Sequence, residues 1–113
     1  MSEVGTKVVF EDEKIKVWEL TLAPGEQTAV HTHEMDYVFY VIDGSSLEVF
    51  DADNQPIGTF DYKDGDVLPL RLEGDVLFIV GDESLSVPAT HSARNAGNTP
   101  YREILVETKP DRK

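Results

Sequence analysis

The chain has 113 residues, 40% of them hydrophobic, and we expect residues 1–113 to form one domain around one core. Ten basic against 22 acidic residues give a net charge of −12, and such a surface repels nucleic-acid phosphates and anionic lipids. We therefore expect no nucleic-acid and no membrane partner. No apolar run approaches the roughly 18 residues that span a bilayer, and no apolar export segment opens the chain, so we predict a cytoplasmic protein.

Cysteine is absent from the chain. This excludes disulfides, a thiol nucleophile and thiolate metal ligands, so a metal ion would have to be held by His, Asp, Glu or Tyr. The chain has three histidines, and these become the most informative residues.

Glycine and proline interrupt the sequence every eight to twelve residues, which leaves no room for a robust amphipathic helix. The segments between them are short and rich in β-branched and aromatic residues, as in an antiparallel sandwich or barrel. The polar stretch 51–66 predicts a hairpin and a loop. The expected strands are 7–10, 14–22, 28–33, 37–42, 47–51, 67–72, 76–80, 85–87 and 101–107.

Two of these strands are apolar on both faces. Residues 37–42 carry aromatic or aliphatic side chains at odd and even positions alike, which indicates a central strand or an interface. Residues 14–22 share this property. The second segment could be core, or it could be the seam of a homodimer.

His31 and His33 lie two residues apart in an expected strand. Their side chains would point the same way from Cα atoms about 6.5 Å apart, so both imidazoles could reach one ion. Two partly exposed histidines on a barrel rim are the alternative.

The surroundings of this pair fit the pattern G-x5-H-x-H-x3-E-x6-G at Gly25, His31, His33 and Gly44, with Tyr37 in the place of the glutamate. A later segment, VGDESLSVPATHSARN, resembles G-x5-P-x-G-x2-H-x3-N, the second motif of the cupin family. His91 and Asn95 match there, whereas the approach from Gly81 is one residue short and Pro88 replaces a glycine. All three histidines thus occupy the positions where cupins place metal-binding imidazoles.

The resemblance implies an all-β, double-stranded β-helix (jelly-roll barrel) that holds a divalent ion, Fe, Mn, Ni or Zn, through His31, His33 and His91. From VWELTLAPGE to YREILVE the chain is similar to the small cupins labelled beta-alanine degradation proteins. Cupins commonly dimerise through N-terminal strands, so the resemblance also implies a homodimer.

Tyr37 is our candidate catalytic residue, with three open roles: a phenolate ligand, a hydrogen-bond donor to water or substrate, or an aromatic wall. Strict alternation turns Asp36 to the opposite face, but a bulge could make it the fourth ligand. Phe39 could line the pocket. Asn95 could support the site, although its cupin equivalent is mostly structural.

Three functions remain open. The first is a metal-dependent enzyme that acts on a small organic acid, amine-derived or thiol metabolite by oxygenation or proton transfer. The second is a non-catalytic module that binds or senses a small molecule. The third is a metal that only stabilises the barrel.

Overall fold

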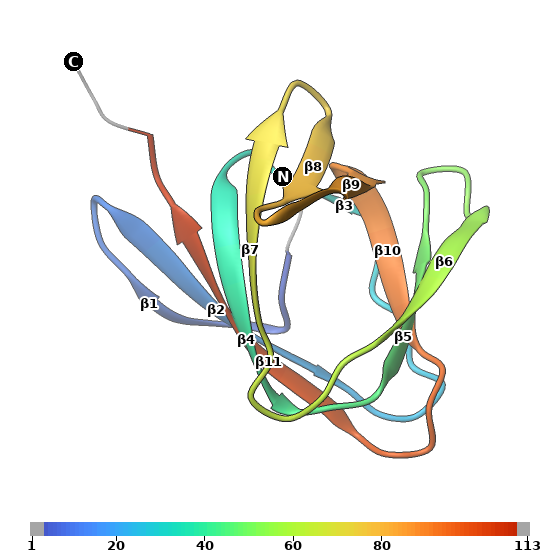
Figure 1. The fold of residues 1–113 in the computed structure, drawn as a ribbon. Helices are drawn as coiled ribbons and strands as arrows, with labels where there is room; N and C mark the ends of the chain where they lie inside the picture. The colour runs from blue at the N-terminus through green and yellow to red at the C-terminus, as the bar shows by residue number, and fades with distance from the viewer. Residues whose placement is uncertain (1–3, 111–113) are drawn as a thin grey trace.

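The fold is built from strands alone (Figure 1). The computed structural model describes residues 4–110, apart from the side chains of residues 82–84, and this range contains eleven strands and no helix. The all-β prediction is therefore confirmed. Nothing within the described range could cross a bilayer as a helix.

The strands form two antiparallel sheets. The larger has the order β1-β2-β11-β4-β7-β8-β9, and the smaller has the order β3-β10-β5-β6. In Figure 1 they face each other as the walls of a barrel. The strands are β1 (Lys7–Glu11), β2 (Ile15–Leu22), β3 (His31–Thr32), β4 (Asp36–Asp43), β5 (Ser46–Phe50), β6 (Pro56–Asp61), β7 (Val67–Glu73), β8 (Val76–Ile79), β9 (Asp82–Pro88), β10 (Thr90–Asn95) and β11 (Tyr101–Thr108).

The structure departs from the expected strands in three places. Strand β10 lies outside all of the expected ranges. The expected strand 28–33 shrinks to the two residues of β3, although the amides of Thr28 and His33 still donate to carbonyls of the β10 side, at Ala93 and Ala89. The polar stretch 51–66 contains the whole of β6, which pairs with β5 as a hairpin. Its polarity is that of an edge strand, since β6 ends the smaller sheet.

The core lies between the two sheets. Along β4, Tyr37, Phe39 and Val41 are buried, whereas Val38 is half-buried and Tyr40 is exposed. The strand is central in its sheet, between β11 and β7, as its two apolar faces predicted. Only the inner face belongs to the core.

Two glycines of the first motif have a backbone reason to be glycine. Gly25 has φ +84°, in the left-handed region that other residues rarely adopt. At Gly44 a Cβ atom would overlap the carbonyl oxygen of Tyr62. Both fix the loops that lead into and out of the segment carrying His31 and His33.

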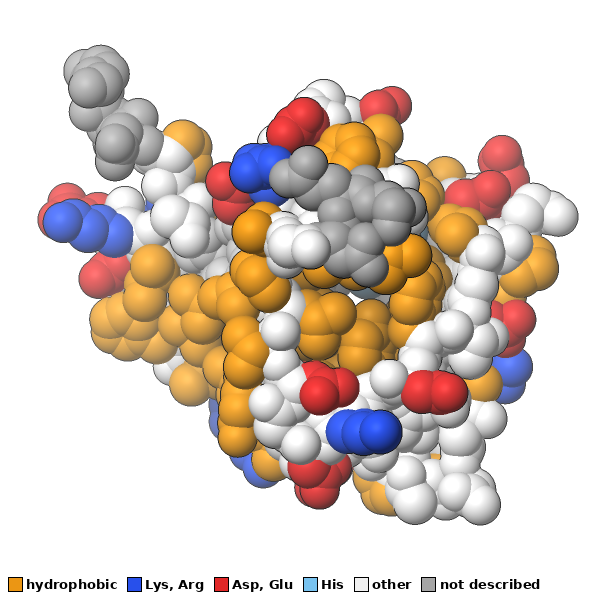
Figure 2. Space-filling view, viewed as in Figure 1, with side chains coloured by type: hydrophobic (Ala, Val, Ile, Leu, Met, Phe, Trp, Pro, Cys, Tyr) orange, Lys and Arg blue, Asp and Glu red, His pale blue; other side chains and the backbone are white. Residues whose placement is uncertain are grey.

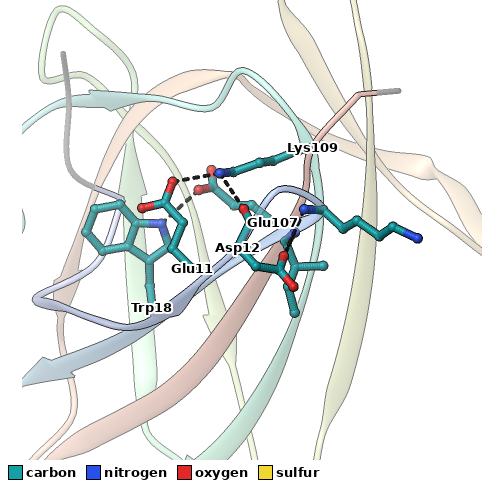
Figure 3. A network of polar contacts seen from close by, with 7 residues as sticks. Glu11, Asp12, Trp18, Glu107 and Lys109 are labelled. Atoms are coloured by element: carbon teal, nitrogen blue, oxygen red, sulfur yellow. Dashed lines mark hydrogen bonds and ion pairs between the residues drawn. The ribbon is translucent and has the colours of Figure 1, made fainter. Parts of the chain in front are cut away.

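A polar network ties the β1–β2 hairpin to the end of β11 (Figure 3). The Lys109 Nζ atom donates to Glu11 Oε2 and to the Asp12 carbonyl oxygen, each at 2.7 Å. Beside it, the Trp18 indole Nε1 donates to Glu107 Oε1 at 2.7 Å. The hairpin is thus held to the rest of the sheet by side chains as well as by the β2–β11 ladder.

Candidate metal centre

The pairing of β3 with β10 brings the three histidines together. His31 and His91 are directly opposite each other in this antiparallel ladder, and His33 follows two residues later on the same side. The ring centroids are 4.8–5.0 Å apart, and one ring nitrogen from each residue lies within 4.8 Å of the others. The side chains are 3–8% exposed. Within the described residues this is the one group of three that could hold a metal.

Backbone carbonyls orient two of the rings. The Nδ1 atom of His31 lies 3.0 Å from the Ala29 oxygen, and that of His91 lies 2.7 Å from the Pro88 oxygen. A carbonyl oxygen only accepts hydrogen bonds, so Nδ1 must carry the proton in both rings. In the neutral imidazoles the lone pair is then on Nε2, which is the state that binds a metal ion.

Burial keeps these imidazoles neutral. Desolvation, assisted by the neighbouring His91, lowers the pKa of His31 from 6.5 to about 4. The same causes lower the pKa of His33 further, and desolvation lowers the pKa of His91 against the opposing hydrogen bond to Pro88. The lone pairs therefore stay available at neutral pH.

The residues present fit a divalent ion. The Nδ1 atom of His33 is buried and has no hydrogen-bond partner among the described residues, and an unsatisfied buried polar atom costs about 1–3 kcal/mol. Three neutral imidazoles suit Zn, Fe, Ni and Cu alike. In a tetrahedral site the ligand nitrogens would lie about 3.4 Å apart, so a modest contraction of the group would accommodate the ion.

Tyr37 lies against the group of three histidines. Its ring stacks on that of His33, with centroids 4.3 Å apart and 16° between the planes. No hydrogen bond to its hydroxyl occurs among the described residues, and burial together with nearby Glu103 raises its pKa well above 10. The protein surroundings thus oppose the phenolate and favour the roles of aromatic wall and neutral hydrogen-bond donor.

The structure places Asp36 outside the cavity. It is exposed, and its Oδ1 accepts a hydrogen bond of 2.8 Å from the Leu72 amide on β7. The bulge that would turn it inward does not occur, because β4 pairs regularly with β7 and β11 around this position. Asp36 is therefore not the missing carboxylate ligand.

Asn95 also lies outside the cavity lining, which agrees with the structural role that its cupin equivalent implies rather than with a role in supporting the site. Its side-chain amide donates to the carbonyl oxygens of Leu22 and Thr99, and its Oδ1 accepts from Ser45 and the Gly97 amide. These four bonds satisfy the polar atoms of a fully buried side chain. They hold together the loops at the opposite end of the barrel from the histidines. Phe39, by contrast, lines the cavity.

The histidines open into a cavity of about 80 Å³ between the sheets, and Figure 2 shows a hollow lined by hydrophobic side chains on this face. Its polar lining consists of Thr28, His31, His33, Tyr37, Tyr62, His91 and Glu103. Its apolar lining consists of Val4, Leu20, Phe39, Leu47, Val49, Phe60, Leu68, Leu70, Ile79, Val87, Ala93 and Leu105. The cavity therefore offers a few polar contacts in an apolar container, as ligand sites commonly do.

Glu103 is the residue that sequence reasoning missed. It is 4% exposed on the inner face of β11 and accepts a 2.5 Å hydrogen bond from the Tyr101 hydroxyl. Burial raises its pKa to about 7, against the lowering effect of that hydrogen bond. The sequence contained a signal, since Glu103 lies on the same face of the strand as Tyr101 and Leu105. The signal was ambiguous, because Ile104 and Val106 make the other face equally apolar.

Replacing any one of the three histidines with alanine should reduce bound divalent metal from one ion per chain to well below one, because two imidazoles leave a weak site. Metal content after Zn²⁺ loading and dialysis, measured by mass spectrometry, checks this. Asp36→Asn is the matched control and should keep one ion. Full metal retention by His91→Ala would rule out a shared site.

Glu103→Gln should be stabilising relative to the wild type at high pH. The folded-state pKa of about 7 lies above the unfolded value of 4.5, so the wild type loses stability as pH rises through this window while glutamine does not titrate. Between pH 5 and 8 the difference in unfolding free energy should move by roughly 3 kcal/mol. Urea unfolding of the metal-free proteins measures it. Titration of the three histidines contributes equally to both proteins and so does not affect the difference. Glu13→Gln is the control for the loss of a surface charge. A difference independent of pH would contradict the assignment.

A family model identifies the family, and solved structures identify the fold. A family model described as auxin binding protein matches residues 2–62, just over half of the chain. A search of curated proteins finds no match. A cupin domain from Bordetella pertussis Tohama I has 22% sequence identity and a TM-score of 0.67, with coverage of 97% of this chain and 99% of that one.

Two further structures share the fold. An RmlC-like cupin with a double-stranded β-helix fold from Methanocaldococcus jannaschii is 15% identical, with a TM-score of 0.58 and coverage of 90% of this chain and 76% of that one. A sugar phosphate isomerase of the cupin superfamily from Silicibacter pomeroyi is 21% identical, with a TM-score of 0.54 and coverage of 87% and 52%. The double-stranded β-helix prediction is confirmed. By its family match and its fold, the chain belongs to the auxin binding protein family, a family of the cupin type.

Proposed function

We propose that the protein is a metal-dependent enzyme acting on a small organic acid, amine-derived or thiol metabolite. The observation that carries this proposal is the group of three buried, neutral imidazoles facing an apolar cavity. His31, His33 and His91 would hold the ion. When bound, a divalent ion supplies Lewis acidity, and three neutral ligands leave its charge uncompensated, which favours an anionic substrate.

The remaining cavity residues would position the substrate and exclude water. The volume of about 80 Å³ favours a ligand of a few non-hydrogen atoms. Phe39 and the aliphatic lining would contact its carbon chain, and Tyr37 would form the wall beside the ion or donate a hydrogen bond. Since the described residues of the lining include neither Lys nor Arg, a carboxylate would be recognised mainly at the metal.

A non-catalytic binding or sensing module is the second candidate. The specific observation in its favour is that Tyr37 stands where the first motif has a glutamate, and that among the side chains the structure describes no carboxylate joins the group of three histidines. A purely structural metal fits less well, because structural sites are closed by four protein ligands and this group supplies three.

The enzymatic proposal predicts turnover. Protein loaded anaerobically with Fe²⁺ and then exposed to air should consume oxygen with at least one member of a panel of small amino acids, thiols and diketones, and His33→Ala should not. Tyr37→Phe should keep the metal. A lower rate in that variant would show that the Tyr37 hydroxyl donates a hydrogen bond to the substrate. An unchanged rate would show that Tyr37 is only an aromatic wall of the cavity. Binding of panel members without turnover under Fe, Mn, Ni or Zn would favour the sensing module.

We also propose a homodimer formed through the outer face of the larger sheet. The β2, β11 and β4 ladders align Val17, Val106 and Val38 in one row across this face, and Ile104 and Tyr40 are neighbours in the next. Tyr40 is 49% exposed, and hydrophobic side chains gather on the left side of Figure 2. Such an apolar patch supports self-association, against the mutual repulsion of two chains of net charge −12.

Light scattering of the eluted protein should give twice the chain mass of 12.6 kDa. Val106→Lys should give the monomer, since it places a charge in the centre of the apolar rows. Ile57→Lys, at an exposed apolar position of β6 in the other sheet, is the control and should remain a dimer. A monomeric wild type would overturn the proposal. The cytoplasmic location and the resemblance to beta-alanine degradation proteins stay predictions.

A further inference from the structure

The cavity has a second polar end. Along β4, Tyr37 stacks on His33, Phe39 follows, and Val41 pairs with Glu103 of β11. Val41 follows Tyr37 by four positions along the strand, which is about 13 Å of backbone. The histidines and Glu103 therefore line the same cavity from positions well separated along its wall.

Aromatic rings connect the two ends. Tyr37 and Phe39 have centroids 6.4 Å apart, Phe39 meets Tyr62 edge-on at 5.5 Å, and Tyr62 lies 6.2 Å from Tyr101. Tyr101 then donates to Glu103 Oε1. A ligand that extends from the histidines toward Glu103 would pass along these rings, which suits a carbon chain.

Glu103 has a hydrogen-bonding capacity that the protein leaves unused. Its Oε1 is bound by Tyr101, but among the described residues no donor bonds to Oε2. A carboxylate oxygen that lines an apolar cavity is costly without a donor, so a ligand group that donates there gains a strong contact. Tyr37 and Tyr62 line the same cavity as Glu103, so all three groups face one space.

We infer that Glu103 is a specificity-determining residue, and that the cavity takes a short organic acid whose far end carries a hydrogen-bond donor, an ammonium or a hydroxyl group. This inference rests on the proposed function for the other end, where the acid would meet the metal. A ligand with an acid group at one end and a hydrogen-bond donor at the other matches the two polar ends of the cavity. Its carbon atoms match the apolar lining between them.

The test uses zinc-loaded full-length protein and three- and four-carbon acids that end in a methyl, a hydroxyl or an ammonium group. Calorimetry or competition with a dye measures each Kd. In the wild type, at one of the two chain lengths, the ammonium or hydroxy acid should bind about tenfold tighter than the methyl-ended acid, the effect of one hydrogen bond to a charged group.

Two substitutions separate recognition from metal chelation. Glu103→Gln keeps the shape and an acceptor for Tyr101 but removes the charge, so it should reduce the ammonium preference about tenfold and leave the methyl-ended acid within about twofold. Glu103→Leu should remove both preferences. Glu107→Gln, on the same strand face but bonded to Trp18 and outside the cavity lining, is the matched control and should change nothing.

Each failure has its own signature. A chain that takes up no zinc refutes the proposed metal function. One zinc per chain with equal Kd values for the three ends, or with no acid bound at all, overturns the inference about Glu103 alone. A preference that survives Glu103→Leu would assign it to chelation at the metal and would equally overturn the inference.

Discussion

The register of β3 against β10 is the constraint on which the candidate site depends. These strands share only two paired positions, Thr32 with Thr90 and His31 with His91. A shift by one residue would turn the imidazoles of one strand out of the cavity, because successive side chains alternate between faces. Backbone hydrogen bonds hold the register on both sides. The backbone amide of His33 donates to the carbonyl oxygen of Ala89, and the backbone amide of Asn95 donates to the carbonyl oxygen of Glu26, next to Gly25. The loop glycines and Asn95 thus serve the histidines without touching them.

Alternation and spacing were sufficient to predict most strands, the pair His31 and His33 and the inward direction of Tyr37, whereas His91 was added by the resemblance to the second cupin motif. They also gave the outward direction of Asp36, which only an added bulge would have reversed. Asn95 has the parity of His91 on β10, but parity says nothing of depth along the barrel. The bonds of its amide to the loops of Leu22 and Thr99 depend on tertiary contacts that no local pattern encodes.

Glu103 was unpredictable for a different reason. In β11 both faces carry aliphatic residues, so the sequence did not decide which one is the core, and a glutamate normally assigns its own face to solvent. The structure puts the acidic face inside, where Tyr101 bonds to Glu103 and Trp18 bonds to Glu107. Meanwhile arginines pair with acidic residues elsewhere, as Arg94 does with Glu48 and Arg102 with Glu19. Among the described residues, the buried polar and charged side chains therefore include carboxyl groups and imidazoles but no lysine or arginine.

The position of β11 has a consequence for how the barrel forms. Although β2 and β4 precede it in the chain by many residues, they do not pair with each other, and β11 fills the place between them. Until that segment has been synthesised, the larger sheet exists as two separate pieces with unpaired edges, β1-β2 and the strands from β4 onward. The long-range pairing of β11 must therefore form late, which slows folding. Until then, unpaired strand edges are exposed to other chains.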